Sequence, residues 1–441
     1  GKAEVVGFGQ GAITAWYSGQ IAIARITSPW PNTIADTVFA QAPRRNFIDE
    51  LVLAQLRQLN LKPSPPCTDS EFIRRAHLDV VGTLPTPAET KAFLASNAKD
   101  KRDKLIDQLL ARPDFIDYWT YRWADLFLIS GKKLRPNALK AYYNWLRGEV
   151  AKNTPWDQLV RQVITARGDS MVRGATNFYA IHQEPETMAE NVSQAFMSLS
   201  IGCAKCHNHP LEKWTNDQYY SFANLFARVR VKGWGGDARN GSGARTLFIA
   251  SRGDLLQPRT GKPQLPAPLD GAPVANPATD RRAVLADWLT SPDNPYFTRS
   301  IANRVWANFF GRGIVNPVDD LRVSNPATNE PLLKALATHL SKNKYDLKSL
   351  MRTILQSETY GRSSAPLAEN IGDTRFYSRQ YPRRLMAEVL QDAITSVTQV
   401  SPKFGTITLS DGSKQNTAFY KDGTRALQLF DSAVTSYFLK T

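Results

Sequence analysis

The chain has 441 residues, of which 42% are apolar and 10% aromatic, and it carries a net charge of +15 with a pI near 9.6. These values predict two to four globular domains and exclude a disordered chain. No apolar run approaches the ~20 residues of a membrane-spanning helix. Lys and Arg are spread along the chain without a long basic block, so the sequence does not favour nucleic-acid binding. A diffuse basic surface instead suits an acidic protein partner or a polyanionic glycan.

Residues 1–28 show the alternation of a β-hairpin, with a turn at Ser18-Gly19. Their Gly-x-Gly-x-Gly-x-x-Ile-Thr-Ala pattern resembles the last strands of a bacterial Ig-like surface domain. Too few strands are present for a whole sandwich. We therefore expect the sequence to begin inside such a domain, and we interpret the Pro- and Thr-rich residues 29–45 as a linker.

From residue 46 the apolar spacing becomes helical, which predicts a helical domain over residues 46–231. Capping-box patterns begin at Thr68, Thr86 and Thr215. Helices are predicted over 101–111, 113–129, 137–151, 155–166 and 185–200. The aromatic residues of these helices are mostly at helical spacing, which favours a packed aromatic core over a cofactor pocket.

Residues 232–280 are rich in Gly and Pro and are interpreted as an irregular or β linker. Helical periodicity returns over 281–400, with helices predicted at 280–290, 295–310, 330–341, 347–356 and 382–397. Residues 401–441 have the pattern of a β-rich tail, and we expect the natural chain to continue beyond Thr441. The predicted fold class is mainly α: two helical units, a short N-terminal β segment and a strand-like tail.

The most informative stretch joins two predicted helices. It reads Gly202-Cys203-Ala204-Lys205-Cys206-His207-Asn208-His209-Pro210, and it holds two of the three cysteines and two of the five histidines of the chain. Cys-x-x-Cys-His is the spacing of covalent c-type haem attachment. Two thiols add to the porphyrin vinyl groups, and the following histidine ligates the iron. Aromatic residues in the next helix predict an apolar wall around the motif.

Three other readings of the two cysteines stay open. A redox dithiol is normally found in a thioredoxin-like βαβ context, which the sequence lacks. A zinc site needs further ligands, and no second Cys-x-x-Cys or His-x-x-x-His pattern exists. A structural disulfide between Cys203 and Cys206 has no functional meaning. The third cysteine, Cys67, either pairs outside this sequence or stays as a free buried thiol, which we favour.

Candidates for the sixth iron position are few. His209 is tied by its backbone to the proximal side, so we expect it to bond a propionate or cap the next helix. Met197 lies on the helix that leads into the motif, and His182 lies just before that helix in a loop-like segment. We slightly favour His182, because imidazole is the stronger ligand. An open or externally ligated position is the alternative.

Several motifs together resemble a known pair of domains, the planctomycete-type cytochrome-like domain and the domain that regularly follows it. The first is carried by residues 72–87 (Phe-Ile-Arg-Arg-Ala-His-Leu-Asp-Val-Val-Gly-Thr-Leu-Pro-Thr-Pro), by Trp119-x-x-x-Trp123-x-Asp125 and by the cysteine motif. The second is carried by residues 285–295, by Asn303-Arg304-Val305-Trp306 and by Arg383-Arg384-Leu385. The resemblance implies a bacterial, extracytoplasmic protein whose function is not established.

The sequence thus predicts one haem c per chain, held by Cys203, Cys206 and His207, in a periplasmic or cell-surface protein. We expect an electron-transfer or structural subunit of a larger assembly, with protein partners that include an acidic one. The alternative is a surface protein without haem, structural, adhesive or acting on anionic polysaccharide, in which the two cysteines form a disulfide or metal site. No catalytic constellation stands out, so an enzymatic role is left undecided.

Overall fold

The computed structural model describes residues 4–440 except 18–19, 132, 183, 234–242, 276–277, 409–411, 431–433, 435 and 437. In this described part the chain is 44% helical, with 16 α-helices and only small sheets. The prediction of a mainly α fold is confirmed. None of the described helices is both long and apolar enough to cross a membrane.

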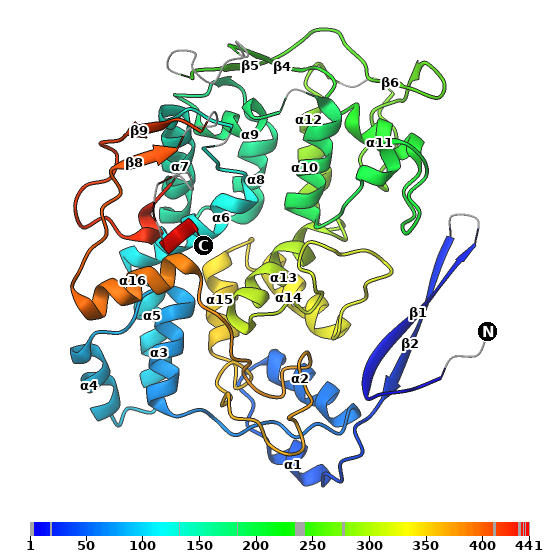
Figure 1. The fold of residues 1–441 in the computed structure, drawn as a ribbon. Helices are drawn as coiled ribbons and strands as arrows, with labels where there is room; N and C mark the ends of the chain where they lie inside the picture. The colour runs from blue at the N-terminus through cyan, green and yellow to red at the C-terminus, as the bar shows by residue number, and fades with distance from the viewer. Residues whose placement is uncertain are drawn as a thin grey trace.

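The N-terminal residues form the predicted hairpin. Strands β1 (Gly9–Tyr17) and β2 (Gln20–Ser28) pair antiparallel from Gly9 with Ser28 to Tyr17 with Gln20. The hairpin extends along one side of the molecule in Figure 1 and leaves the aromatic side chains of Trp16 and Tyr17 exposed. It therefore adds little to the helical core.

The first helical stretch follows the predicted order from α2 onward, whereas α1 lies within residues 29–45, which were interpreted as a linker, and the short α9 was not predicted. Its helices are α1 (Asp36–Gln41), α2 (Phe47–Gln58), α3 (Asp69–Val80), α4 (Pro87–Ala95), α5 (Lys101–Ala111), α6 (Pro113–Leu126), α7 (Pro136–Ala151), α8 (Trp156–Ile164), α9 (Asn177–Ala180), α10 (Pro185–Met197) and α11 (Asn216–Ala223). Three of them end earlier than predicted: α6 at Leu126, α8 at Ile164 and α10 at Met197. Leu128 and Ser198, which follow α6 and α10, adopt left-handed backbone conformations, with φ of 57° and 55°, which stop a helix.

The predicted capping boxes are confirmed at Thr86 and Thr215, where side chain and backbone bond reciprocally. The third prediction was half wrong. Thr68 Oγ1 does accept from the Glu71 backbone N–H, but the Glu71 carboxylate accepts instead from the backbone N–H of Ser364. The second hydrogen bond of this capping box is therefore replaced by a bond to a segment that is distant in the sequence.

The linker between the helical stretches contributes small sheets. Strand β5 (Thr246–Ile249) lies between β3 (Gly168–Asp169) and β4 (Val229–Lys232), and β6 (Leu256–Gln257) pairs with β7 (Lys262–Pro263). These strands run across one end of the molecule (Figure 1). Residues 234–242 and 276–277 of the predicted linker lie outside the described residues.

The second helical stretch and the tail complete the chain. They comprise α12 (Arg282–Leu289), α13 (Phe297–Phe310), α14 (Glu330–Lys342), α15 (Leu347–Leu355), α16 (Ala387–Thr398), and strands β8 (Thr406–Thr408) and β9 (Lys414–Asn416). Helix α16 begins later than predicted. Arg383 lies upstream of it, outside the helix, because its guanidinium bonds the Asp79 carboxylate and the Asn308 carbonyl.

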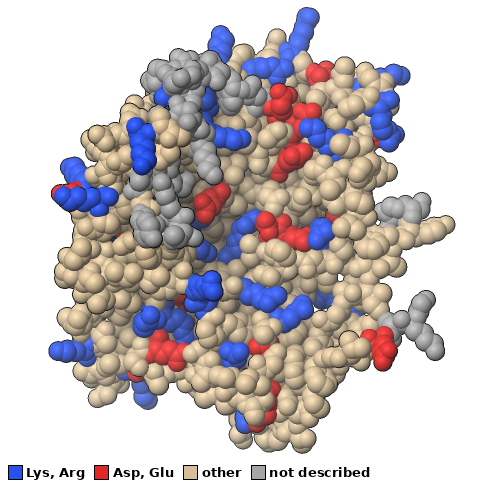
Figure 2. Space-filling view, viewed as in Figure 1, with Lys and Arg blue, Asp and Glu red and all other residues tan. Residues whose placement is uncertain are grey.

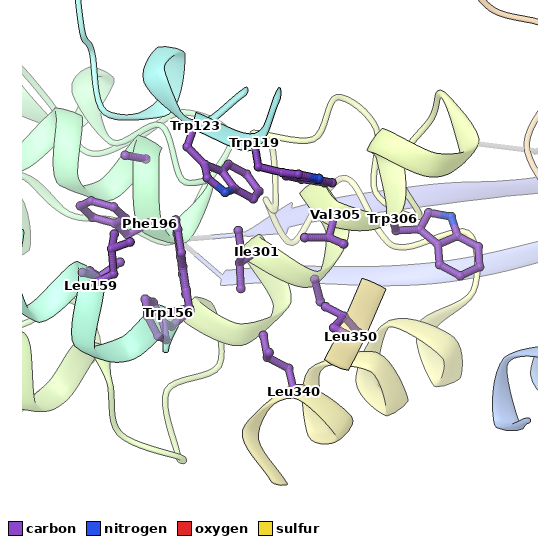
Figure 3. Close-up of a cluster of buried hydrophobic side chains, with 14 of the residues drawn as sticks. Trp119, Trp123, Trp156, Leu159, Phe196, Ile301, Val305, Trp306, Leu340 and Leu350 are labelled. Carbon is purple, nitrogen blue, oxygen red and sulfur yellow. The ribbon is translucent and has the colours of Figure 1, made fainter. Parts of the chain in front are cut away.

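The two helical stretches share one hydrophobic core. A single cluster of buried side chains runs from Phe39 to Leu427. Trp119 and Trp123 of α6 face Ile301 and Val305 of α13 in Figure 3. The Trp119 ring lies 6.0 Å from that of Phe309, between centroids. The first stretch therefore buries its aromatic face against the second.

A buried polar network also crosses this junction. The Asp79 carboxylate at the end of α3 accepts from the Tyr360 hydroxyl at 2.9 Å and forms an ion pair with Arg383. Asn308 Nδ2 donates to the Asp79 carbonyl at 3.1 Å, and Tyr118 donates to Asn308 Oδ1 at 3.3 Å. Burial raises the pKa of Asp79, so its charge depends on these partners.

Candidate haem-attachment site

The cysteine motif lies on a turn that folds back along α10. Helix α10 ends at Ser198, and the Ser193 hydroxyl donates to the Leu199 carbonyl at 2.8 Å. Gly202 then lies beside α10, where a Cβ built on it would be 3.6 Å from the carboxyl carbon of Glu190. The motif is thus placed against the side of α10 and not beyond its end.

Both thiols of the motif are exposed and free. Cys203 belongs to a 3₁₀ turn, η2 (Gly202–Lys205), and Cys206 ends that turn. Residues three apart within a 3₁₀ helix are eclipsed, but Cys206 lies one position beyond η2. The two exposed thiols are three residues apart, as the haem-attachment motif has them.

His207 is also exposed, and its ring has a defined hydrogen bond. Nδ1 lies 2.8 Å from the carbonyl oxygen of Asn208. A carbonyl only accepts, so Nδ1 carries the hydrogen and the neutral ring keeps its lone pair on Nε2. This is the arrangement of a metal-ligating histidine, in which the second nitrogen is oriented by a backbone carbonyl.

Asn216 holds the turn in place. It is buried at the start of α11, and its Nδ2 donates to the carbonyls of Ala204 at 2.8 Å and Lys205 at 3.0 Å. Its backbone N–H donates to Asn208 Oδ1 at 3.0 Å. Sequence reasoning missed this residue, because an asparagine after a capping threonine has no distinctive pattern.

His209 has a structural place that differs from the expected one. It is buried, its Nδ1 accepts from the Leu211 N–H at 3.1 Å, and its own N–H donates to the Trp214 carbonyl at 2.8 Å. The expectation that it caps the next helix was wrong, since Thr215 caps α11. Burial lowers the pKa of His209 and favours its neutral form.

The other predicted ligands are not brought to the turn. Met197 is fully buried within the core cluster. His182 is also buried, and Asn191 Nδ2 lies 3.0 Å from its Nε2. Burial lowers the pKa of His182 to about 4. The expectation that His182 sits in a segment free to be aimed does not match this packing.

The expected aromatic side chains do lie beside the motif, but they meet it through polar groups. Tyr219 and Tyr220 of α11 are buried, and their hydroxyls bond the Glu190 carboxylate at 2.6 Å and the Lys205 carbonyl at 3.2 Å. The backbone of the turn is therefore hydrogen-bonded to the aromatic residues beneath it.

The donor set of the turn fits haem better than the other readings of the cysteines. Two free, exposed thiols at the attachment spacing and an imidazole oriented by a backbone carbonyl match thioether attachment and one axial ligand. In the part of the chain that the structure describes, no group of three or more His, Cys, Asp or Glu side chains is placed to hold a metal ion. All three cysteines are free, and burial raises the pKa of the Cys67 thiol.

The chain thus combines a mainly α fold with a surface Cys-x-x-Cys-His turn. Two family models match it. Residues 47–231 match a family model named PSCyt2 and described as a protein of unknown function (DUF1549). Residues 281–434 match a model named PSD1, likewise of unknown function (DUF1553). Their tandem order agrees with the planctomycete-type pair. No curated protein and no solved structure matches the chain.

Proposed function

We propose that this chain is an extracytoplasmic c-type haem-binding protein that carries one haem, as an electron-transfer or structural subunit of a larger assembly. The observation that carries the proposal is the exposed turn, where Cys203 and Cys206 are free and the His207 ring is oriented by the Asn208 carbonyl. When bound, haem supplies an iron centre that cycles by one electron.

The residues of the turn have separate roles in this proposal. Cys203 and Cys206 each form a thioether bond, which fixes the porphyrin against the turn. His207 Nε2 ligates the iron while its Nδ1 stays bonded to the Asn208 carbonyl. Asn216 holds the backbone of the turn, so the three groups keep their spacing.

The second axial position is not supplied by the turn. The sequence favoured His182, but its burial and its contact with Asn191 argue against ligation in this conformation. Met197 is enclosed in the core. The proposal therefore assigns His207 alone from this chain, with the opposite face open to water or to a ligand from another protein.

The location and partner class rest on chemistry. Covalent haem is attached outside the cytoplasm, which supports a periplasmic or cell-surface protein. The net charge of +15 suits an acidic redox partner, since complementary charge speeds docking. Because Cys203 and Cys206 are exposed, a haem held by them would lie at the surface, where a partner could approach it.

The test is expression of the full chain, with a secretion signal, in a bacterium that has the haem-attachment machinery. We expect haem staining to persist on a denaturing gel and the mass to increase by one haem. Cys203→Ala with Cys206→Ala removes the staining, whereas Cys67→Ala, a matched cysteine away from the turn, leaves it unchanged. Each single variant retains one thioether, so its haemochrome band moves towards that of vinyl-bearing haem.

Two results would contradict the proposal. One is a wild-type chain without covalent haem in a host that matures a control cytochrome. The other is staining that survives in the double variant. A mass lower by two hydrogens, lost when either cysteine is replaced, would instead support the disulfide of the alternative surface protein.

A further inference from the structure

A cleft lies at the junction of the two family-matched stretches. It has a volume of about 380 Å³ and is bordered by α6, α10, α13 and the segments that carry Asp319 and Met386. A second cavity of about 220 Å³ shares four of its lining residues and adjoins it. Figure 2 shows a hollow near the centre of the drawn face, with Lys and Arg side chains gathered beside it.

The lining residues come from sequence motifs that haem attachment does not use. Trp119, Trp123 and Asp125 belong to the Trp-x-x-x-Trp-x-Asp pattern of α6, and Arg304 belongs to the Asn-Arg-Val-Trp pattern of α13. The adjoining cavity adds the Arg-Arg-Leu pattern that starts at Arg383. Motifs about 180 residues apart in sequence thus line one space.

Arg304 brings an incompletely hydrogen-bonded guanidinium to this cleft. One of its terminal nitrogens donates to the Gln194 carbonyl at 3.2 Å, and its Nε is buried without a hydrogen-bond partner. Burial lowers the pKa of Arg304, and the charge of nearby Asp319 raises it. The Asp319 carboxylate accepts from Gln194 Nε2 at 2.9 Å, and among the described residues no ion pair joins it to Arg304.

A neighbouring arginine on the same helix differs from Arg304, because both of its terminal nitrogens are paired with a carboxylate. Arg299 lies just over one turn before Arg304 and binds both carboxylate oxygens of Glu330. A guanidinium fork is shaped for such two-point contacts with carboxylate or sulfate oxygens. The buried Nε of Arg304 has no such contact among the described residues, and an anionic ligand would supply one.

Other groups in the cleft are suited to contact the uncharged part of a ligand whose anionic group binds Arg304. Arg122 contacts the Met386 sulfur at 3.1 Å and has no ion pair among the described residues. Asp125 has no side-chain hydrogen bond there, and burial raises its pKa. Asp125 and the free oxygen of Asp319 can accept from hydroxyl groups. The edges of Trp119 and Trp123 add an apolar wall.

We propose that this cleft binds an acidic sugar residue, with the anionic group on Arg304 and Arg122, hydroxyls on Asp125 and Asp319, and the ring against the indoles. The volume lies within the range of small-molecule sites, roughly 300–1,000 Å³. This site is independent of the haem turn, because it shares none of the residues that attach haem.

The test is calorimetric titration of the haem-free full chain with three probes: a galacturonate trimer, a neutral galactose trimer and inorganic sulfate. We expect the galacturonate trimer to bind and the neutral trimer to bind at least about tenfold more weakly, since charge-assisted contacts are lost. Arg304→Gln and Arg122→Gln each weaken binding by about tenfold or more. Arg299→Gln, on the same helix but outside the cleft, leaves binding unchanged.

The outcomes separate the possibilities cleanly. Equal binding of the neutral trimer, or binding of sulfate as tight as that of the galacturonate trimer, overturns the proposal. So does galacturonate binding that survives in both cleft variants. Arg122 is partly exposed, so Arg122→Gln keeps the test valid if Arg304→Gln melts at a lower temperature. Because the probe protein lacks haem, a negative result leaves the proposed haem function unaffected.

Discussion

Helix α10 has two faces that serve two different regions. Its Glu190 accepts from the Tyr219 hydroxyl and borders the cysteine turn, whereas its Asn191 and Gln194 line the cleft. The turn and its supports come from one continuous stretch, residues 190–220. The cleft needs α6, α10 and α13 together. A local site keeps a recognisable spacing in the sequence, and a composite one does not.

The largest expected effect is a loss of stability when the contacts between the two helical stretches are removed near the cleft. Asp79→Ala leaves the partly exposed guanidinium of Arg383 and the buried Tyr360 hydroxyl without their acceptor. Each donor that loses its acceptor costs about 1–3 kcal/mol of unfolding free energy, so the two losses together make this the largest effect. Urea denaturation followed by tryptophan fluorescence measures it.

The matched control is Asp107→Ala, which breaks an exposed pair with Arg352 and costs about 0–1 kcal/mol. Haem staining of Asp79→Ala should persist in the folded fraction, because the turn is held locally. If the two variants are equally stable, the network at Asp79 does not hold the junction.

The next largest effect is a pH dependence of stability caused by His182, whose ring contacts Asn191 of the cleft lining. Its folded pKa of about 4 is below the ordinary value near 6.5, so the unfolded chain takes up the proton first as the pH falls. Stability from this group is complete above pH 6.5 and is lost on acidification towards pH 4. The loss is about 3 kcal/mol.

Urea denaturation of the haem-free chain at several pH values, with His182→Gln beside the wild type, checks this. The variant should have a flatter profile between pH 6.5 and 4. His207→Gln, at an exposed position, is the control. Identical profiles for His182→Gln and wild type would show that His182 is not buried as a neutral ring.

A smaller effect tests the turn. Asn216→Ala leaves the carbonyls of Ala204 and Lys205 without their donor, at a cost of about 1–3 kcal/mol. Hydrogen exchange around residues 203–208 should accelerate, and the yield of attached haem should fall. Binding in the cleft should not change, and a parallel loss there would show that the two faces of α10 are not independent.

The smallest effect comes from the helix cap next to the turn. Thr215→Ala removes the capping box of α11 and costs about 1 kcal/mol. Thr86→Ala removes the corresponding box of α4, far along the chain, at a similar cost. Thermal melting compares the two. Only Thr215→Ala should also lower haem attachment, and an equal effect of both on attachment would contradict the local model of the turn.

The sequence predicted what depends on neighbours in the chain. The capping threonines, the helix order and the Cys203 spacing are local, so they were readable without a structure. Burial of His182 and Met197 was not, because it depends on which face of α10 meets the core. The roles of Asn216 and Arg304 depend on partners that only tertiary packing brings near.

The shared core also bears on how the chain folds. Asp79 meets Arg383, Tyr118 meets Asn308, and the Trp30 ring lies 5.9 Å from that of Phe376. During synthesis the N-terminal helices therefore emerge long before the segments that cover their apolar face. Such non-local contacts slow folding and leave surface open to aggregation. We expect the apolar face of residues 47–231 to stay partly uncovered until α13 and the segment that carries Arg383 have been synthesised.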